Sequence, residues 1–136
     1  MLVCGDVLLA DISPAIGLYP ESRPDPLADY LRTLERIAEL APAIAYPGHG
    51  EPVREPAERA RQLVEHHTRR LEQTQVALDS RPRSGYEVSV ALFGEQLTPP
   101  QRRFAVAESL SHLEHLVARG RAARGFADRT LAYTAT

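Results

Sequence analysis

The sequence of 136 residues lacks several features that would place it in particular classes of protein. It has one cysteine, Cys4, which excludes an intramolecular disulfide and is typical of a reducing cytoplasm. No apolar run approaches the ~20 residues that a membrane span needs, and no signal peptide is recognised before the first strand. We therefore expect a cytoplasmic protein. All 16 basic residues are arginine, and we interpret the absence of lysine as coding bias rather than function.

Charge is unevenly distributed along the chain. The hydrophobic fraction of 43% is normal for a folded protein, and the net charge of -2 alone suggests neither nucleic acid nor membrane. Residues 1–80 carry eight arginines against thirteen acidic residues, a net charge of −5. Residues 81–136 carry eight arginines against five acidic residues, a net charge of +3. This shift predicts a domain boundary near Arg81.

The first 80 residues predict short strands and two helices. Strands are expected at residues 2–4, 7–9 and 43–46. The proline-rich stretch 11–24 is expected to be a loop. Asp25, as N-cap, and Pro26, at the first helical position, predict a helix that ends before Pro42. Apolar residues recur along it at spacings of three and four, and a second helix is expected over 56–80.

The last 56 residues predict a helix, a longer helix and a hairpin. After a break at residues 81–85, the short helix is expected over 86–93, and Thr98 precedes the long one. Gly120 ends that helix as its C′ residue. Residues 121–126 and 130–134 are expected to form a β-hairpin. This order is that of a winged-helix domain.

Two residues after short strands are candidate metal ligands. Asp6 follows a glycine, and a carboxylate there can bridge two cations, although a turn or cap aspartate is the alternative. His49 lies between two glycines, which leave its imidazole unobstructed. Neutral imidazole is a common zinc ligand, but a polar loop histidine is the alternative.

The other four histidines lie on predicted helices. Adjacent helical residues are ~100° apart, so His66 and His67 cannot easily share a metal. One is expected to pack against or cap a neighbouring segment and the other to face solvent. His112 and His115 are three residues apart and could chelate, but His112 falls among the leucines and is expected to pack in a core.

Arginines in the C-terminal region could form a basic face that binds nucleic acid. These are Arg102, Arg103, Arg119, Arg121, Arg124 and Arg129. Glu108 and Glu114 are interleaved among them, and no run of aromatic residues accompanies them. A solvated charged surface is therefore the preferred interpretation.

Several motifs, in this order, resemble the second half of a metallo-β-lactamase-fold hydrolase. They are Gly5-Asp6 before Val7–Leu9, Ile12–Pro14, Asp25–Leu31, Tyr46–Gly50, and Glu65–His67 with Arg70. Ala107–Leu113, Leu116 and Gly120 are similar to the winged-helix-like C-terminal domain of one subgroup. The resemblance covers nearly the whole chain. It implies an α/β (α+β) fold, a partial αββα sandwich over residues 1–80 with a linking helix at 56–80, and a winged-helix-like domain over 81–136.

The resemblance also implies a metal centre. The family usually holds two zinc ions that activate a bridging hydroxide for hydrolysis. By position, Asp6 would be the bridging carboxylate and His49 the last histidine of the second metal site. The family's His-x-His-x-Asp-His signature has no counterpart here, and neither does the histidine that precedes its glycine-aspartate strand. A catalytic zinc site needs at least three protein ligands plus water.

We therefore expect a truncated or split member of this family that is inactive alone and holds no stoichiometric zinc. Its intact relatives hydrolyse thioesters, lactone-like esters or RNA. The alternatives are a winged-helix nucleic-acid-binding module and a structural remnant that self-associates. Leu2, Val3 and Val7–Leu9 would expose unpaired strand edges, which predicts a homodimer through the N-terminal strands.

Overall fold

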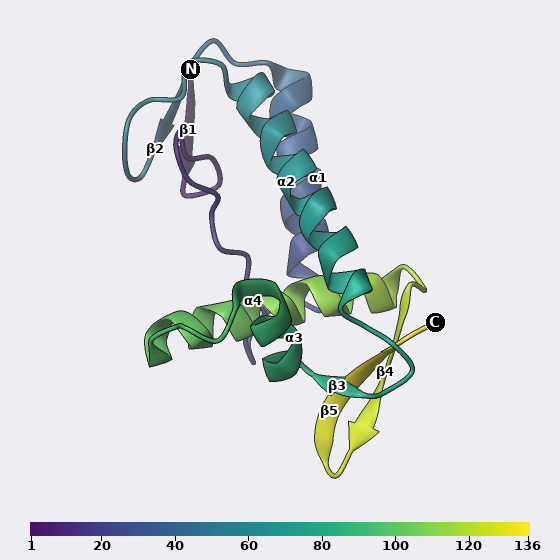
Figure 1. The fold of residues 1–136 in the computed structure, drawn as a ribbon. Coiled ribbons are helices and arrows are strands. Elements are labelled where there is room, and N and C mark those ends of the chain that lie inside the picture. The colour runs from purple at the N-terminus through teal and green to yellow at the C-terminus, as the bar shows by residue number, and fades with distance from the viewer. The chain divides into compact units, whose positions relative to one another are not determined.

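The computed structural model describes all 136 residues, which form two compact units. The first unit comprises Met1–Ala15 and Ala28–Thr68, and the second comprises Ile16–Leu27 and Arg69–Thr136. Helices and short strands are mixed along the chain (Figure 1), which confirms the predicted α+β class. The divisions at Ala28 and Thr68 fall inside two helices, so each of those helices contributes residues to both units.

The sheet of the first unit has two parallel strands, β1 (Leu2–Gly5) and β2 (Ala45–Pro47). Leu2 lies opposite Ala45, and Gly5 lies opposite Pro47. The chain after β2 turns back, because Ala45 also exchanges two backbone hydrogen bonds with Val53, of 2.9 and 2.8 Å. Since the strands are parallel, their carboxyl ends meet at one edge of the sheet.

Two helices form the core of the first unit, α1 (Pro26–Leu40) and α2 (Pro56–Val76), which lie alongside each other in Figure 1. Each has proline at its first position, where no backbone donor is lost. Their apolar residues point inward at the predicted spacing, with Leu34 of α1 and Leu63 of α2 at most 1% exposed. Burial of one such leucine contributes about 1.5–3 kcal/mol. The predicted extent of the first helix is confirmed to within a residue.

The predicted strand at Val7–Leu9 is wrong. These residues form bends, although Leu8 is fully buried. The carbonyl oxygens of Val7 and Leu9 accept hydrogen bonds from helix side chains instead of from a neighbouring strand. The Tyr30 hydroxyl donates to the Val7 carbonyl at 2.8 Å, and Arg59 Nε donates to the Leu9 carbonyl at 2.7 Å. A short apolar run is compatible with a buried loop as well as with a strand, because burial alone produces the same pattern.

The second unit consists mainly of the C-terminal helices and strands. In chain order these are β3 (Arg83–Ser84), α3 (Gly85–Phe93), α4 (Pro99–Ala118), β4 (Ala122–Ala127) and β5 (Thr130–Ala135). The strands form one antiparallel sheet in the order β3-β5-β4. The predicted helices and hairpin are present, whereas the two-residue strand β3 was not predicted. Such a short strand has no periodicity of its own and exists through its pairing with β5.

Both helices of the second unit begin with a capping box. The Glu87 backbone donates to Ser84 Oγ at 3.2 Å, and the Ser84 backbone donates to Glu87 Oε2 at 2.9 Å. Thr98 and Gln101 make the same reciprocal pair at the start of α4. A capping box satisfies backbone donors that a helix start otherwise leaves without partners. These caps fix where α3 and α4 begin.

The predicted end of the second helix at Ser80 is wrong, because α2 ends at Val76. Asp79 accounts for the difference. Its carboxylate accepts hydrogen bonds from the Arg81 backbone at 2.8 Å and from the Arg83 guanidinium at 2.9 Å. An aspartate that bonds the backbone two residues later forms a turn that competes with helix.

Candidate metal site

The candidate metal site lies where β1 and β2 end. Asp6 follows β1 directly, and His49 follows β2 by two residues. Side chains at the carboxyl ends of neighbouring parallel strands lie close together, which is why such edges hold ligand sites in α/β proteins. The resemblance assigned both residues to one metal centre, and the structure brings their side chains together.

The contact between the two side chains is a hydrogen bond of 2.8 Å between His49 Nδ1 and Asp6 Oδ1. An ionised carboxylate only accepts hydrogen bonds, so the His49 hydrogen lies on Nδ1. In the neutral ring, the second nitrogen, Nε2, then carries the lone pair. A carboxylate that fixes a histidine tautomer in this way is a common partner of metal-binding histidine. The Asp6 and His49 side chains are 64% and 80% exposed, so both reach solvent.

Gly48 allows the two strand ends to approach closely. Its backbone N–H donates to the Gly5 carbonyl at 2.8 Å. A Cβ at residue 48 would lie 3.1 Å from Asp6 Oδ1 and 3.7 Å from the Gly5 carbonyl carbon. A side chain here would therefore press on the carboxylate that holds His49. The glycine before the histidine, which the sequence suggested leaves the ring unobstructed, thus also makes room for Asp6.

Cys4 is close in sequence, and its thiol contacts the loop that follows β1. Its Sγ lies 3.5 Å from the Leu8 carbonyl oxygen, which accepts from the thiol. Burial raises the pKa of the Cys4 thiol above its ordinary value. Only the thiolate is a strong metal ligand. The contact between Asp6 and His49 brings together two donors, a carboxylate oxygen and an imidazole nitrogen, which fit zinc chemically but are fewer than the three that a catalytic site requires.

His66 and His67 differ in burial, but a ring nitrogen of one lies within 4.8 Å of a ring nitrogen of the other, which corrects the prediction that these two residues cannot easily share a metal. His67 is fully buried, and its ring meets the Tyr30 ring edge-on, with the centroids 5.5 Å apart. His66 lies with its ring centroid 5.0 Å from that of His67. The prediction that one of the two packs on a neighbouring segment is confirmed for His67. His66 is half-buried rather than solvent-facing, which corrects the second part of that prediction.

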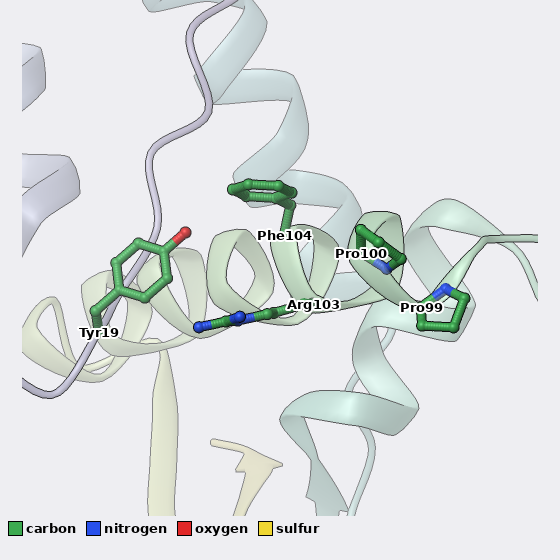
Figure 2. A pocket seen from close by; sticks show the side chains of 5 residues that line it. All are labelled: Tyr19, Pro99, Pro100, Arg103 and Phe104. Carbon is green, nitrogen blue, oxygen red and sulfur yellow. The ribbon is translucent and has the colours of Figure 1, made fainter.

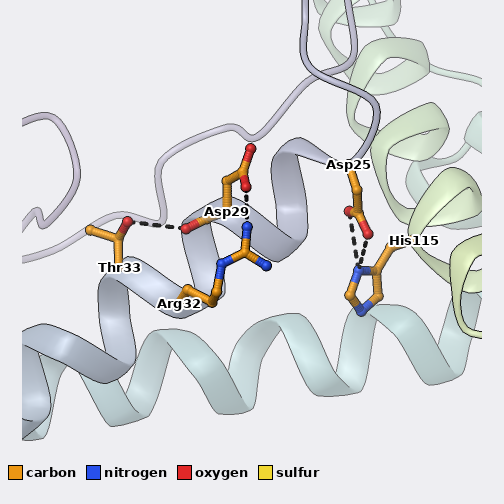
Figure 3. Close-up of polar contacts among 5 residues, drawn as sticks. All are labelled: Asp25, Asp29, Arg32, Thr33 and His115. Carbon is orange, nitrogen blue, oxygen red and sulfur yellow. Dashed lines mark hydrogen bonds and ion pairs between the residues drawn. The ribbon is translucent and has the colours of Figure 1, made fainter.

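The rings of His112 and His115 both make hydrogen bonds within the second unit. His112 is fully buried, as predicted, with Nδ1 2.8 Å from the Glu108 carbonyl oxygen. His115 Nδ1 lies 3.0 and 3.2 Å from the two carboxylate oxygens of Asp25 (Figure 3). The sequence did not reveal this pair. Its two members are ninety residues apart in the sequence. The sequence also offered another role for Asp25, that of a helix cap.

The C-terminal arginines are partly engaged in contacts within the second unit. Three of the six bind side chains there, namely Arg102 with Ser89, Arg121 with Gln75 and Arg124 with Glu114. Arg102 also lies over the Tyr86 ring, 5.5 Å from its centroid. Half of the candidate basic face is thus committed to contacts within the protein.

Comparisons with known proteins agree with this picture. Residues 71–136 match the family model of the metallo-beta-lactamase-like C-terminal domain. A protein of Bacillus subtilis (strain 168) described as "Probable metallo-hydrolase YqjP" is 31% identical over an alignment of 121 residues that covers 84% of this chain and 37% of that protein. The metallo-beta-lactamase family protein TTHA1429 from Thermus thermophilus is 40% identical, with a TM-score of 0.85 over 98% of this chain and 41% of that one.

A second solved structure gives the same result. It is a beta-lactamase domain protein from Burkholderia ambifaria, 33% identical, with a TM-score of 0.89 over 98% of this chain and 41% of its own. The fold and the sequence thus define a metallo-β-lactamase-fold protein. The chain belongs to that family and corresponds to its C-terminal part. It spans about two fifths of the length of these relatives.

Metal binding is a general property of a metallo-hydrolase family. Asp6 and His49 are the residues of this chain whose geometry bears on that property. No helix here combines the length and apolar character that crossing a membrane requires.

Proposed function

We propose that Asp6 and His49 are two ligands of a zinc centre in a metallo-β-lactamase-fold hydrolase, and that this chain is inactive alone. The observation that carries the proposal is the 2.8 Å contact between His49 Nδ1 and Asp6 Oδ1 at the carboxyl ends of two parallel strands. The exposure of both side chains supports it, because a ligand set that is completed from elsewhere must be open.

Each residue has a distinct role in this proposal. Asp6 orients the His49 ring through Oδ1 and leaves Oδ2 as a donor atom. His49 offers Nε2, which carries the lone pair. When bound, zinc supplies Lewis acidity and lowers the pKa of a bound water. With only two donors, the chain lacks the third protein ligand of a catalytic site, so further ligands have to come from outside residues 1–136.

We propose that the complete enzyme hydrolyses an ester, a thioester or RNA. The support is the resemblance to a family whose members act on these bonds through a dinuclear centre. Nucleic-acid binding by the C-terminal region alone is the weaker candidate, because three of its six arginines have side-chain partners in their own unit.

Metal binding to the chain tests the ligand roles. Protein purified without added metal is expected to hold less than one zinc per chain. Excess zinc should shift the NMR signals of Asp6 and His49, and Asp6→Asn or His49→Ala should abolish these shifts. Asp11→Asn is the matched control, because Asp11 is exposed and lies in the same loop region. Shifts that survive in Asp6→Asn and His49→Ala would show that zinc binds elsewhere.

Hydrolysis assays test the proposed inactivity. Ester, thioester and RNA substrates should turn over no faster with the chain and zinc than with buffer and zinc. Metal-dependent turnover that His49→Ala removes would contradict the proposal, because the chain would then supply a complete ligand set by itself.

We also propose that a homodimer forms through the N-terminal strands. β1 pairs only with β2, so its outer edge presents unpaired backbone groups. Val3 of β1 and its neighbour Met1 are 76% and 86% exposed, whereas Leu8 and Leu9, which the sequence predicted to be exposed, are 0% and 9% exposed. Open strand edges template pairing with another chain, and two-fold dimers are the commonest closed assembly.

Sedimentation of the purified chain tests the dimer. We expect a dimer at micromolar concentrations that Val3→Lys dissociates. Val76→Lys is the control, because Val76 is also highly exposed, at 85%, but lies at the end of α2 in the other unit. A wild-type chain that stays monomeric at high micromolar concentration would contradict the proposal.

A further inference from the structure

The second unit contains a hollow that has no role in the metal site. It measures about 530 Å³, which lies within the usual size range of small-molecule sites. Its walls are Tyr19, Pro99, Pro100, Arg103 and Phe104. Figure 2 shows Tyr19 and Arg103 extending toward one another beside the ring of Phe104. Four of these residues lie at the start of α4, and the fifth comes from a distant part of the sequence.

That distant segment is held firmly on α4. The Leu18 backbone donates to the Ala107 carbonyl at 2.9 Å, and Ser111 Oγ donates to the Ile16 carbonyl at 2.5 Å. A Cβ at Gly17 would lie 3.0 Å from the Ala107 Cβ, so the segment touches the helix where both residues are small. The hollow is therefore bounded by two parts of the chain whose mutual position these contacts fix within the second unit.

Tyr19 is itself held in place. Its backbone N–H donates to Ser22 Oγ at 2.9 Å, and the Ser22 N–H donates to the Tyr19 carbonyl, also at 2.9 Å. Its ring covers Gly17, where an added Cβ would lie 2.8 Å from Cε2. The tyrosine is thus anchored through its backbone and one ring face, and its hydroxyl remains for another partner.

The one charged residue of the hollow is Arg103. The Arg103 side chain makes no hydrogen bond or ion pair in the structure, and the Tyr19 hydroxyl makes no hydrogen bond. No acidic side chain lines the hollow. The neighbouring Arg102 differs, because its guanidinium donates to Ser89 Oγ at 3.0 Å and to the Gly94 carbonyl. One of two adjacent arginines is therefore used structurally, and the other faces the hollow.

We propose that this hollow binds an aromatic carboxylate. A guanidinium and a carboxylate match as a pair of parallel hydrogen bonds, and one arginine balances the single charge of one carboxylate. The tyrosine hydroxyl donates a further hydrogen bond. Phe104 and the two prolines form the apolar wall that a flat ring contacts, and Phe104 is 59% exposed without a ligand.

Matched small probes test the chemistry of the ligand. Benzoate, added to ¹⁵N-labelled protein, should shift the NMR signals of residues 99–104 and Tyr19. Benzamide has the same shape without the charge, and acetate has the charge without the ring. Each should bind at least tenfold more weakly than benzoate, because each lacks one of the two contacts. Phenyl phosphate tests a dianion and is expected to bind no more tightly than benzoate.

Matched variants test the location. Arg103→Gln should weaken benzoate binding about tenfold, which corresponds to about 1.4 kcal/mol. Arg36→Gln removes an exposed arginine of α1 and should have no effect. Tyr19→Phe should weaken binding several-fold, whereas Tyr46→Phe should not, although the two tyrosines are 41% and 42% exposed.

Four results would overturn the proposal. Benzamide that binds as tightly as benzoate would show that the charge is irrelevant, and acetate that binds as tightly would show the same for the ring. Phenyl phosphate that binds more tightly would assign the hollow to phosphate esters. If Arg103→Gln does not fold, Tyr19→Phe tests the location instead, because this variant loses only one hydroxyl from an exposed side chain. Unchanged benzoate binding by Tyr19→Phe would place the ligand elsewhere.

Discussion

The two units pair their backbone polar groups in different ways. In the first unit the sheet has two strands, and loop carbonyls after β1 accept hydrogen bonds from Tyr30 and Arg59 on the helices. In the second unit three antiparallel strands pair with one another, and both helices begin with capping boxes. Local sequence specifies the second unit, whereas the first depends on side chains that reach across it.

This difference has a functional side. A two-stranded sheet is marginally stable by itself, but Asp6 and His49, which follow the carboxyl ends of its strands, are exposed. In the second unit the histidines of α4 are not exposed in this way, because His112 and His115 are buried with partners. The candidate ligands thus lie in the less regular unit.

Core truncations are expected to have the largest effects and to separate the two units. Leu113→Ala in α4 and Leu34→Ala in α1 each remove a side chain that is 0% exposed. Each should lower the free energy of unfolding by about 2–5 kcal/mol. Native-state hydrogen exchange should show faster exchange in β4 and β5 for Leu113→Ala, and in β1 and β2 for Leu34→Ala. Equal acceleration of both sheets by either variant would show that the two units unfold together.

Loss of a helix cap should have a smaller effect, confined to the second unit. Ser84→Ala removes the acceptor of the Glu87 N–H and should cost about 0.5–2 kcal/mol. Thr98→Ala should cost a similar amount at the start of α4. Urea unfolding measures both, and Ser80→Ala, which changes an exposed serine outside the helices, is the control. An unchanged midpoint in both cap variants would mean that the boxes contribute nothing.

Removal of one hydroxyl should weaken the first unit in a similar way. Tyr30→Phe deletes the donor to the Val7 carbonyl and should cost about 0.5–1.5 kcal/mol. Burial raises the pKa of the Tyr30 hydroxyl, which agrees with its position inside the unit. Hydrogen exchange should increase around residues 7–9. Tyr86→Phe, at an exposed tyrosine, should leave exchange there unchanged.

Acid should produce the smallest effect, and again in the second unit. The Arg83 guanidinium lowers the pKa of Asp79, and the Ser84 backbone N–H lowers that of Glu87. Since both values are lower in the folded state, their contribution is present above the ordinary pKa of about 4 and is lost as the pH falls through the lowered values. Melting temperatures between about pH 5 and 2 should therefore fall less for Asp79→Asn and Glu87→Gln than for the wild type.

Much of the fold could be predicted because its signals are local. Proline at the first helical position, regular apolar spacing and a two-residue turn each act within a few residues. The turn at Asp128 and Arg129 has positive φ at both positions, 48° and 66°, as tight hairpins require. What could not be predicted depends on distant residues. The strand at Arg83 exists only beside β5, and the loop at Val7–Leu9 is held by Tyr30 and by a residue of α2.

The candidate site shows the same division. The contact between Asp6 and His49 was predictable, because parallel strands bring their ends together whatever lies between them in sequence. The pair of His115 and Asp25 was not, because no local rule links a helix interior to a loop ninety residues earlier. The hollow beside Tyr19 was missed for the same reason, since its walls come from two separate segments.

The attachment of the segment before α1 also bears on how this protein tolerates changes in chain length. Leu18 is fixed at Ala107, and Asp25 is fixed at His115, eight residues further along α4. Eight helical residues advance about 12 Å, whereas the seven steps from Leu18 to Asp25 could span about 24 Å if extended. The connection therefore holds about twice the chain that it needs. An insertion or deletion of one residue after Ser22 can be absorbed there while both attachment points stay where they are.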